Sequence, residues 1–164
     1  MDTATTGKDI ELDSPGVNLM PPSVFFTCLA VGGLMAFFFP RTFPLLPKML
    51  RFFLGLGIGA SGFALMLAAD NTFKRIGTNV PTNLPATTFV AQGVYRFSRN
   101  PMYVGGSAFF LGIGLMVGSP WMVVAYFPLG VYLAGYVVPR EEAYMTRTFG
   151  SEYRSYCRQV GRWL

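Results

Sequence analysis

Long runs of apolar residues alternate with polar segments along the chain, and four of these runs contain no Asp, Glu, Lys or Arg. The runs are 16 to 18 residues long and occupy positions 22–39, 52–69, 102–117 and 121–138. A helix needs about 20 apolar residues to cross about 30 Å of hydrocarbon, and flanking aromatic or basic side chains let slightly shorter helices span it. The pattern therefore predicts an all-α integral membrane protein with four transmembrane helices.

The polar segments predict how the rest of the chain is organised. Residues 1–18 are small and polar, with four acidic side chains against Lys8, which predicts a disordered N-terminal tail and not a signal peptide. Residues 19–164 then form one membrane-embedded domain. The segment 70–101 is 32 residues long, which is long for a structureless connection, so we expect it to fold on the bilayer surface.

The third and fourth runs are separated by residues 118–120 alone, so they must form a tight helical hairpin. Glycines in the second and third runs favour close helix packing in membranes, and contact of the third run with a lipid-like chain is the alternative. Pro128 should kink the fourth helix near its middle. Beyond it, residues 139–164 predict an amphipathic cytoplasmic tail helix, broken at Gly150, that can cover the mouth of the hairpin.

The composition and charge support this arrangement. Hydrophobic residues make up 52% of the chain and charged residues 13%, with a net charge of +5; typical globular domains have about 25% charged residues. With four crossings, ten of the thirteen basic residues fall on the side that holds both termini. The positive-inside rule then places both termini and the polar mouth of the hairpin in the cytoplasm. Topology and anionic lipid thus account for the positive charge, and we expect no nucleic-acid partner.

The residue inventory excludes several kinds of chemistry. The chain has no histidine, and Cys28 and Cys157 stand far apart in the sequence, so neither imidazole catalysis nor a site with metal-ligand spacing is expected. Phosphate-binding loops, serine-hydrolase motifs and the Gly-x-Gly-x-x-Gly fingerprint are missing as well.

Polar residues are concentrated at the two ends of the hairpin. Arg99 and Asn100 precede the third apolar run, and Glu141 and Glu142 follow the fourth, on the same side of the membrane. Pro101 should begin the helix and leave its first N–H groups facing the loop, where a polar ligand can dock. The carboxylates can bind a cation or ribose-type hydroxyls. An ion pair between Arg99 and one glutamate, holding the hairpin together, is an equal alternative.

The ordered pattern of these residues resembles a known family. Gly93, the run Arg99-Asn100-Pro101-Met102-Tyr103, the pair Glu141-Glu142, Phe149-Gly150, Tyr153 and Tyr156 are similar to the C-terminal signature of the isoprenylcysteine carboxyl methyltransferase family. The broader group also holds phospholipid methyltransferases. The resemblance implies a membrane enzyme that uses S-adenosylmethionine, bound outside any Rossmann fold.

Carried over residue by residue, the resemblance implies the following cofactor contacts: Thr87, Thr88, Phe89, Val90, Tyr95, Asn100, Pro101, Met102, Tyr103 and Glu141. Glu142 and Arg99 are the implied catalytic or supporting residues, with Tyr153 as a further support. Two positions depart from the pattern. Many members have histidine where Asn100 stands, and eukaryotic members have arginine where Val137 stands, so Arg140 becomes the candidate for substrate binding.

These observations lead to a hypothesis about the reaction. Methyl transfer to an ionised carboxylate needs alignment and desolvation more than proton transfer, so the missing histidine is harmless. We therefore expect methylation of a lipophilic or lipidated carboxylate that enters from the bilayer. A phospholipid amine, another lipid or a thiol is the alternative acceptor, with Glu142 as the candidate base. A non-enzymatic four-helix scaffold is the alternative of a different class.

Overall fold

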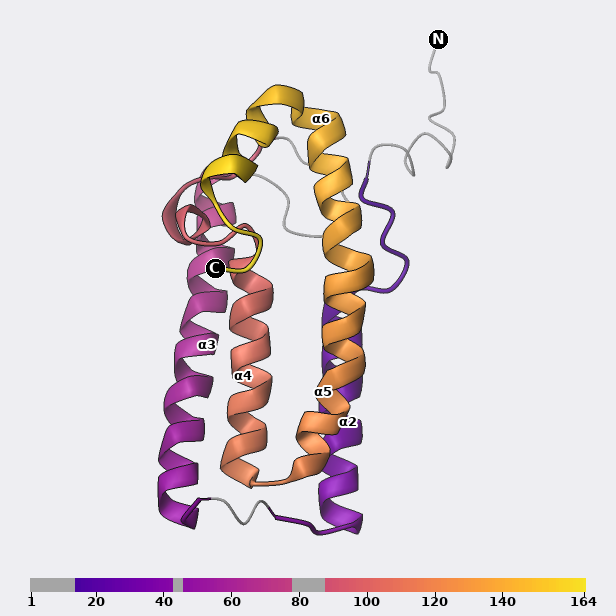
Figure 1. Ribbon diagram of the computed structural model, residues 1–164, viewed down its shortest axis with the longest axis vertical. Coiled ribbons are helices and arrows are strands. Elements are labelled where there is room, and N and C mark those ends of the chain that lie inside the picture. The colour runs from indigo at the N-terminus through magenta and orange to yellow at the C-terminus, as the bar shows by residue number, and fades with distance from the viewer. Residues whose placement is uncertain (1–13, 43–45, 78–87) are drawn as a thin grey trace.

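The computed structural model describes residues 14–42, 46–77 and 88–164. Over these residues the structure is helical and contains no strand. The elements are α2 (Pro21–Phe38), α3 (Lys48–Ile76), the 3₁₀-helix η1 (Gly93–Arg96), α4 (Pro101–Val117), α5 (Pro120–Tyr132), the π-helix η2 (Leu133–Val137) and α6 (Val138–Gln159). The long helices run side by side, and α6 extends past the start of α4 (Figure 1).

Three helical segments are long and apolar enough to cross a membrane, and these are α2, α3 and the continuous helix from Pro120 to Gln159. The third apolar run forms the shorter helix α4 of 17 residues, which begins at Pro101 as predicted. These lengths and compositions support a membrane protein.

The second helix is longer than its apolar run, so the predicted start of the loop at Asp70 is wrong. Helix α3 has 29 residues and continues to Ile76. Nζ of Lys74 lies 2.5 Å from Oδ2 of Asp70, one turn earlier. An ion pair of this kind stabilises a helix where it extends beyond the hydrocarbon core of the bilayer. The helix ends at Gly77, whose φ of 74° is left-handed and whose N–H donates to the Phe73 carbonyl.

Glycines hold α3 and α4 together. A Cβ atom on Gly105 would lie 2.6 Å from the carbonyl oxygen of Gly62, and one on Gly112 would lie 2.5 Å from the backbone nitrogen of Gly59. The two backbones therefore touch directly, as is common for small-residue seams between membrane helices. The glycine wall of α4 packs against a helix, and the alternative of a lipid-like chain against these two glycines is excluded.

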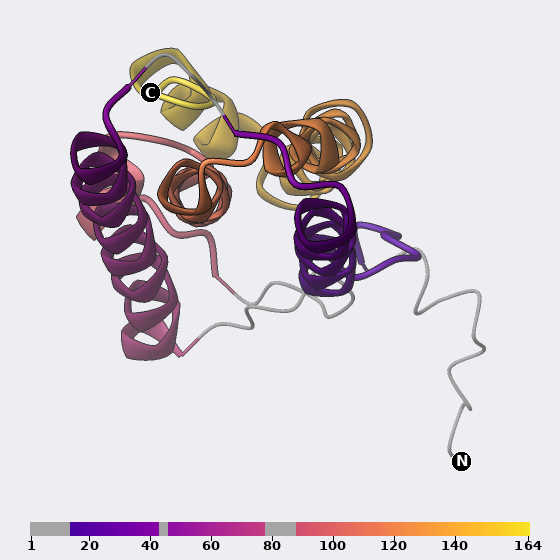
Figure 2. The ribbon, with the colours of Figure 1, turned by 90° about the horizontal axis from the view of Figure 1, so that it is seen from below.

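The other half of the bundle is built from α2 and α5. Seen end-on, α4 lies between α3 and α5, and α2 lies against α5 (Figure 2). Gly32 of α2 meets Met122 and Ala125 of α5. The tight α4–α5 hairpin is confirmed, because Gly118, with φ of 72°, ends α4 and Pro120 begins α5.

Pro128 lies within α5, and the helix continues beyond it. The departure from α-helical geometry comes later, in the π-helix of residues 133–137, which the sequence did not predict. A second departure lies at Gly150, where φ is 53° and ψ is −120°. This break was predicted, and after it the chain turns back toward the start of α4 (Figure 1).

The glycine seam generates a stability prediction. We expect Gly112→Ala to lower the free energy of unfolding by about 1–3 kcal/mol, because the new methyl group meets the α3 backbone, which cannot move aside like a side chain. Gly57→Ala is the matched control, since a Cβ there meets nothing within 4 Å. Thermal unfolding of both variants in the same detergent measures the difference. Equal stability of the two would contradict the direct backbone contact.

Candidate functional site

The polar residues that the sequence singled out meet at one end of the bundle. Two come from the start of α4 and its preceding loop, and two from the start of α6. The hydroxyl of Tyr103 on α4 donates a hydrogen bond of 2.7 Å to Oε1 of Glu141 on α6. Because Glu141 is partly buried, this contact fixes the carboxylate against the first turn of α4.

Glu142 is the centre of an ion-pair network. Its Oε1 lies 2.9 Å from Nη1 of Arg99, and its Oε2 accepts a hydrogen bond of 2.6 Å from Nη2 of Arg162. Nε of Arg162 also donates to Oε1 at 3.1 Å, which makes this pair bidentate. The Arg99–Glu142 part is well shielded, with side chains 14% and 16% exposed. The predicted ion pair between Arg99 and a glutamate is therefore present.

Arg99 makes further contacts that bear on its charge. Its Nη1 donates to Sγ of Cys157 at 2.8 Å. Burial by itself lowers the pKa of the Arg99 guanidinium, but the negative charge of Glu142 and the neighbouring Cys157 and Tyr153 outweigh it, so the net pKa is raised. Nε of Arg99 is buried and has no hydrogen-bond partner among the described residues.

The C-terminal residues close over this end of the bundle, as expected of the tail, through individual contacts that the sequence did not predict. The backbone N–H of Arg99 donates to the carbonyl oxygen of Gly161 at 3.0 Å, and Nδ2 of Asn100 donates to the carbonyl oxygen of Arg162 at 2.9 Å. Asn100 also donates its backbone N–H to Oγ of Ser98. No sequence motif marks these tail residues, because backbone carbonyls accept hydrogen bonds whatever their side chain.

An aromatic cluster lies beside the ion pairs. The ring of Phe89 packs against Phe149, Tyr153 and Tyr156, with centroids 5.1 to 5.9 Å apart. The hydroxyl of Tyr156 donates to the carbonyl oxygen of Tyr95 at 2.6 Å, which ties the tail helix to η1.

Tyr95 is buried between this cluster and α3. It packs edge-on against Phe73. Burial raises the pKa of the Tyr95 phenol, and the negative potential of Glu141 and other neighbours raises it further. The phenol is therefore neutral, so the ring can offer its face to a cation but the oxygen does not act as a base.

The remaining predicted residues lie in different places. Val90 is buried beside Tyr95 and Ala69, with Met102 packed against them, and Pro101 is fully buried at the start of α4. Thr88 is exposed, and Thr87 lies outside the described residues. Arg140 does not join the ion pairs: its guanidinium lies 4.3 Å from the ring centre of Tyr136, and Nη1 donates to the carbonyl oxygen of Gly16.

Metal ligands are not gathered at this site. Within residues 14–42, 46–77 and 88–164, no three His, Cys, Asp or Glu side chains are grouped so that they could hold a metal ion.

Comparison with known protein families gives one match that covers well over half of the chain. Residues 50–152 match the family described as phospholipid methyltransferase. The chain belongs to the phospholipid methyltransferase family. This family includes the isoprenylcysteine carboxyl methyltransferases, so the resemblance in the sequence is confirmed at the level of the family. No curated protein and no solved structure matches the chain.

Family membership indicates a methyltransferase, with S-adenosylmethionine as its methyl donor. The matched region starts in α3 and ends just past Gly150. It therefore contains η1, α4 and the two glutamates, whereas Gly161 and Arg162, which close over them, lie beyond it.

The ion-pair network predicts unequal effects of its members on stability. We expect Glu142→Ala to destabilise the protein by about 3 kcal/mol or more, because it leaves the shielded Arg99 charge without its partner. Arg162→Ala should cost about 1 kcal/mol or less, since that side chain is 44% exposed and water can replace it. Denaturant unfolding in detergent compares the two. An equal loss would show that the Arg99–Glu142 pair is not the stronger contact.

Proposed function

We propose that this protein transfers a methyl group from S-adenosylmethionine to a lipophilic acceptor, with a carboxylate as the preferred nucleophile, as in isoprenylcysteine carboxyl methyltransferases. Membership of the family supports the reaction class. The observation that carries the site is the hydrogen bond from Tyr103 to Glu141, because it joins the start of α4 to the start of α6. The resemblance in the sequence also implies both residues as cofactor contacts.

The residues at this end suit the cofactor chemically. The first N–H groups of α4, on Met102 and Tyr103, precede the first intrahelical bond, which Val104 makes to the Asn100 carbonyl. Such groups favour an anion. The buried Nε of Arg99, which has no partner in the described part of the chain, is a second donor suited to a carboxylate. These donors fit the carboxylate of S-adenosylmethionine.

The positively charged parts of the cofactor need acceptors and ring faces. We assign the ammonium group or the ribose hydroxyls to the Glu141 carboxylate, which accepts one hydrogen bond from Tyr103 and has capacity for more. The neutral rings of Tyr95 and Tyr103 suit a sulfonium, since ring faces attract cations. When bound, the cofactor supplies a methyl group on a positively charged sulfur.

The protein then has to align the acceptor and exclude water. An ionised carboxylate acceptor arrives without a proton to remove, so alignment is the main requirement. Both oxygens of Glu142 are engaged by Arg99 and Arg162. We therefore assign Glu142 and Arg99 the role of positioning the loop before α4, with Tyr153 as a neighbouring support.

We propose that the chain crosses the membrane four times, with α4 as the shortest crossing and both termini in the cytoplasm. The excess of basic residues on the side of the termini supports this orientation. The site, at the end of the bundle where α4 begins and the C-terminal residues fold back, then faces the cytoplasm.

A phospholipid amine is the second candidate acceptor, and the description of the family favours it. Such an amine, or a thiol, must lose a proton when it is methylated, which calls for a base. A scaffold without enzymatic activity remains a third alternative, which cofactor binding tests directly.

The proposal predicts that the purified protein binds S-adenosylmethionine with a dissociation constant on the order of micromolar. Glu141→Ala should weaken binding about tenfold or more, because it removes an acceptor in a shielded site. Tyr103→Phe should have a smaller effect, since it removes one hydrogen bond and keeps the ring. Isothermal calorimetry in detergent measures all three proteins.

Glu152→Ala is the matched control, because Glu152 is an exposed carboxylate on the same helix. Folded wild-type protein that binds no S-adenosylmethionine would contradict the proposed function. Equal weakening by Glu141→Ala and Glu152→Ala would contradict the assignment of Glu141 alone.

The role of Glu142 predicts a particular kinetic result. Glu142→Gln keeps the size of the side chain but removes its charge, so we expect weaker alignment with a partial loss of methyl transfer. If Glu142 acted only through Arg99, raising the pH should not rescue the variant. Complete loss of turnover with unchanged cofactor affinity, restored at high pH, would instead identify Glu142 as the base. Single-turnover rates across pH distinguish the two.

A further inference from the structure

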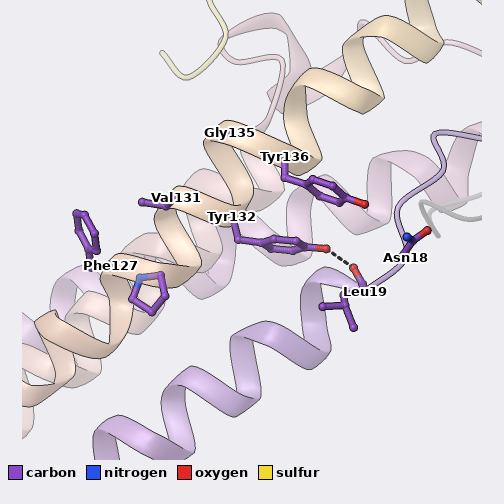
Figure 3. A pocket seen from close by; sticks show the side chains of 8 residues that line it. Asn18, Leu19, Phe127, Val131, Tyr132, Gly135 and Tyr136 are labelled. Carbon is purple, nitrogen blue, oxygen red and sulfur yellow. Dashed lines mark hydrogen bonds between the residues drawn. The ribbon is translucent and has the colours of Figure 1, made fainter.

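A groove opens on the outer face of the bundle, away from the ion pairs. It has a volume of about 960 Å³ and lies between the segment that precedes α2 and the α5–η2 helix. The residues that line it are Asn18, Leu19, Phe127, Pro128, Val131, Tyr132, Gly135 and Tyr136. Asn18 and Tyr136 lie at one end and Phe127 lies at the other (Figure 3). The volume is at the upper end of the range for small-molecule sites.

Both walls of the groove are held in place by hydrogen bonds and packing. The hydroxyl of Tyr132 donates to the carbonyl oxygen of Leu19 (Figure 3), and Arg140 donates to that of Gly16. Val17 is buried in the core beside them. The segment before α2 is therefore fixed against α5–η2, and the groove is part of the folded structure.

The polar end of the groove carries positive charge. The guanidinium of Arg140 lies over the Tyr136 ring, and Tyr136 stacks on Tyr132 with centroids 5.4 Å apart and an interplanar angle of 21°. Arg140 is exposed and forms no ion pair with any residue of the described ranges. Its charge is therefore available at this position to a negatively charged group of a ligand.

The other end of the groove is apolar and open to the bilayer. Phe127 is 72% exposed and Val131 is 56% exposed, and both lie in the second half of the apolar helix α5. A ligand that satisfies both ends has a negatively charged head and a hydrocarbon chain. Because the groove faces the bilayer, such a molecule can reach it by lateral diffusion.

One wall of the groove shares its packing with a residue assigned to cofactor binding. Tyr132 and Tyr136 pack against the same core cluster as Tyr103, whose hydroxyl holds Glu141. Arg140 is the residue immediately before Glu141 in the chain. A head group at Arg140 is therefore next to the first turn of α6, from which the site is built.

We propose that this groove binds the methyl acceptor, and that the acceptor is a single-chain amphiphile with a carboxylate head. The head pairs with Arg140, and the chain lies along Val131 and Phe127. This inference rests on the proposed function; it adds a binding location and narrows the acceptor to a single-chain molecule. The absence of an arginine at Val137, where relatives recognise the substrate, is then compensated by Arg140 from the groove side.

Gly135 offers a direct test, because a Cβ there meets nothing within 4 Å. We expect Gly135→Leu to fill the groove without disturbing the fold, and to abolish most photolabelling by a long-chain fatty acid that carries a diazirine on its chain. The protein is held in nanodiscs of zwitterionic phosphatidylcholine, and labelled peptides are identified by mass spectrometry. Gly33→Leu is the matched control, since Gly33 on α2 is also exposed, with open space around it.

Arg140→Gln tests the head group without changing the groove. It should weaken labelling by the fatty acid a few-fold, about what an exposed ion pair contributes, and leave labelling by the methyl ester of the same probe unchanged. Labelling of peptides 127–136 that is equal in wild type and Gly135→Leu would overturn the groove as a binding site. Equal loss in Gly33→Leu would overturn it as well.

Two further measurements separate the inference from the function on which it rests. Anionic phosphatidylglycerol in the nanodisc should not displace the probe; if it does, the groove holds membrane phospholipid and the acceptor assignment is wrong. S-adenosylmethionine binding is measured on the same samples. Binding without groove labelling would overturn the inference alone, whereas groove labelling without binding would overturn the methyltransferase function and with it the role of the groove.

Discussion

The paired charges of Glu142 hold together three parts of the chain that are far apart in the sequence. Arg99 belongs to the loop before α4, Glu142 to the start of α6, and Arg162 to the C-terminal residues. At this shielded position a lone charge is costly, and losing one partner of such a pair typically costs about 3–5 kcal/mol. The pairs therefore fix the loop, both helix ends and the tail as one unit. Tyr103, Asn100 and Glu141 take their positions from that unit.

The apolar body of the protein explains why this chemistry lies at one end. Inside hydrocarbon, backbone groups must be satisfied within helices, and the glycine contacts between α3 and α4 let two such helices approach backbone to backbone. This contact sets where α4 begins relative to the long helix α3. The first N–H groups of α4 and the buried Nε of Arg99 then lie in the same region, outside the apolar segments, where an anionic group can be bound.

Much of the helical pattern follows from the sequence, because apolar runs, Pro101 and the left-handed glycines Gly118 and Gly150 have local physical causes. The extent of α3 does not. Lys74 and Asp70 are compatible with either a helix or a loop, and only their i, i+4 ion pair in the structure shows that the helix continues. The π-helix of residues 133–137 has no local signal either. At the site, the Arg99–Glu142 pair follows from charge and topology. The hydrogen bonds that Arg99 and Asn100 donate to Gly161 and Arg162 do not, because they use backbone carbonyls, which every sequence has.

The central claim is that the end of the bundle built around Glu141 and Glu142 transfers methyl groups to a lipophilic carboxylate. Turnover with radiolabelled methyl donor tests this claim most directly. The purified protein in lipid nanodiscs is incubated with the labelled S-adenosylmethionine and a panel of a farnesylated cysteine derivative, a fatty acid, phosphatidylethanolamine and an alkanethiol. Mild base releases methanol from a carboxyl methyl ester but not from N-methyl or S-methyl products. We predict base-labile label in the organic phase, strongly reduced with Glu141→Ala. Base-stable label would contradict the carboxylate acceptor. If protein that binds the cofactor transfers no methyl group to any compound of the panel, the lipophilic acceptor is contradicted.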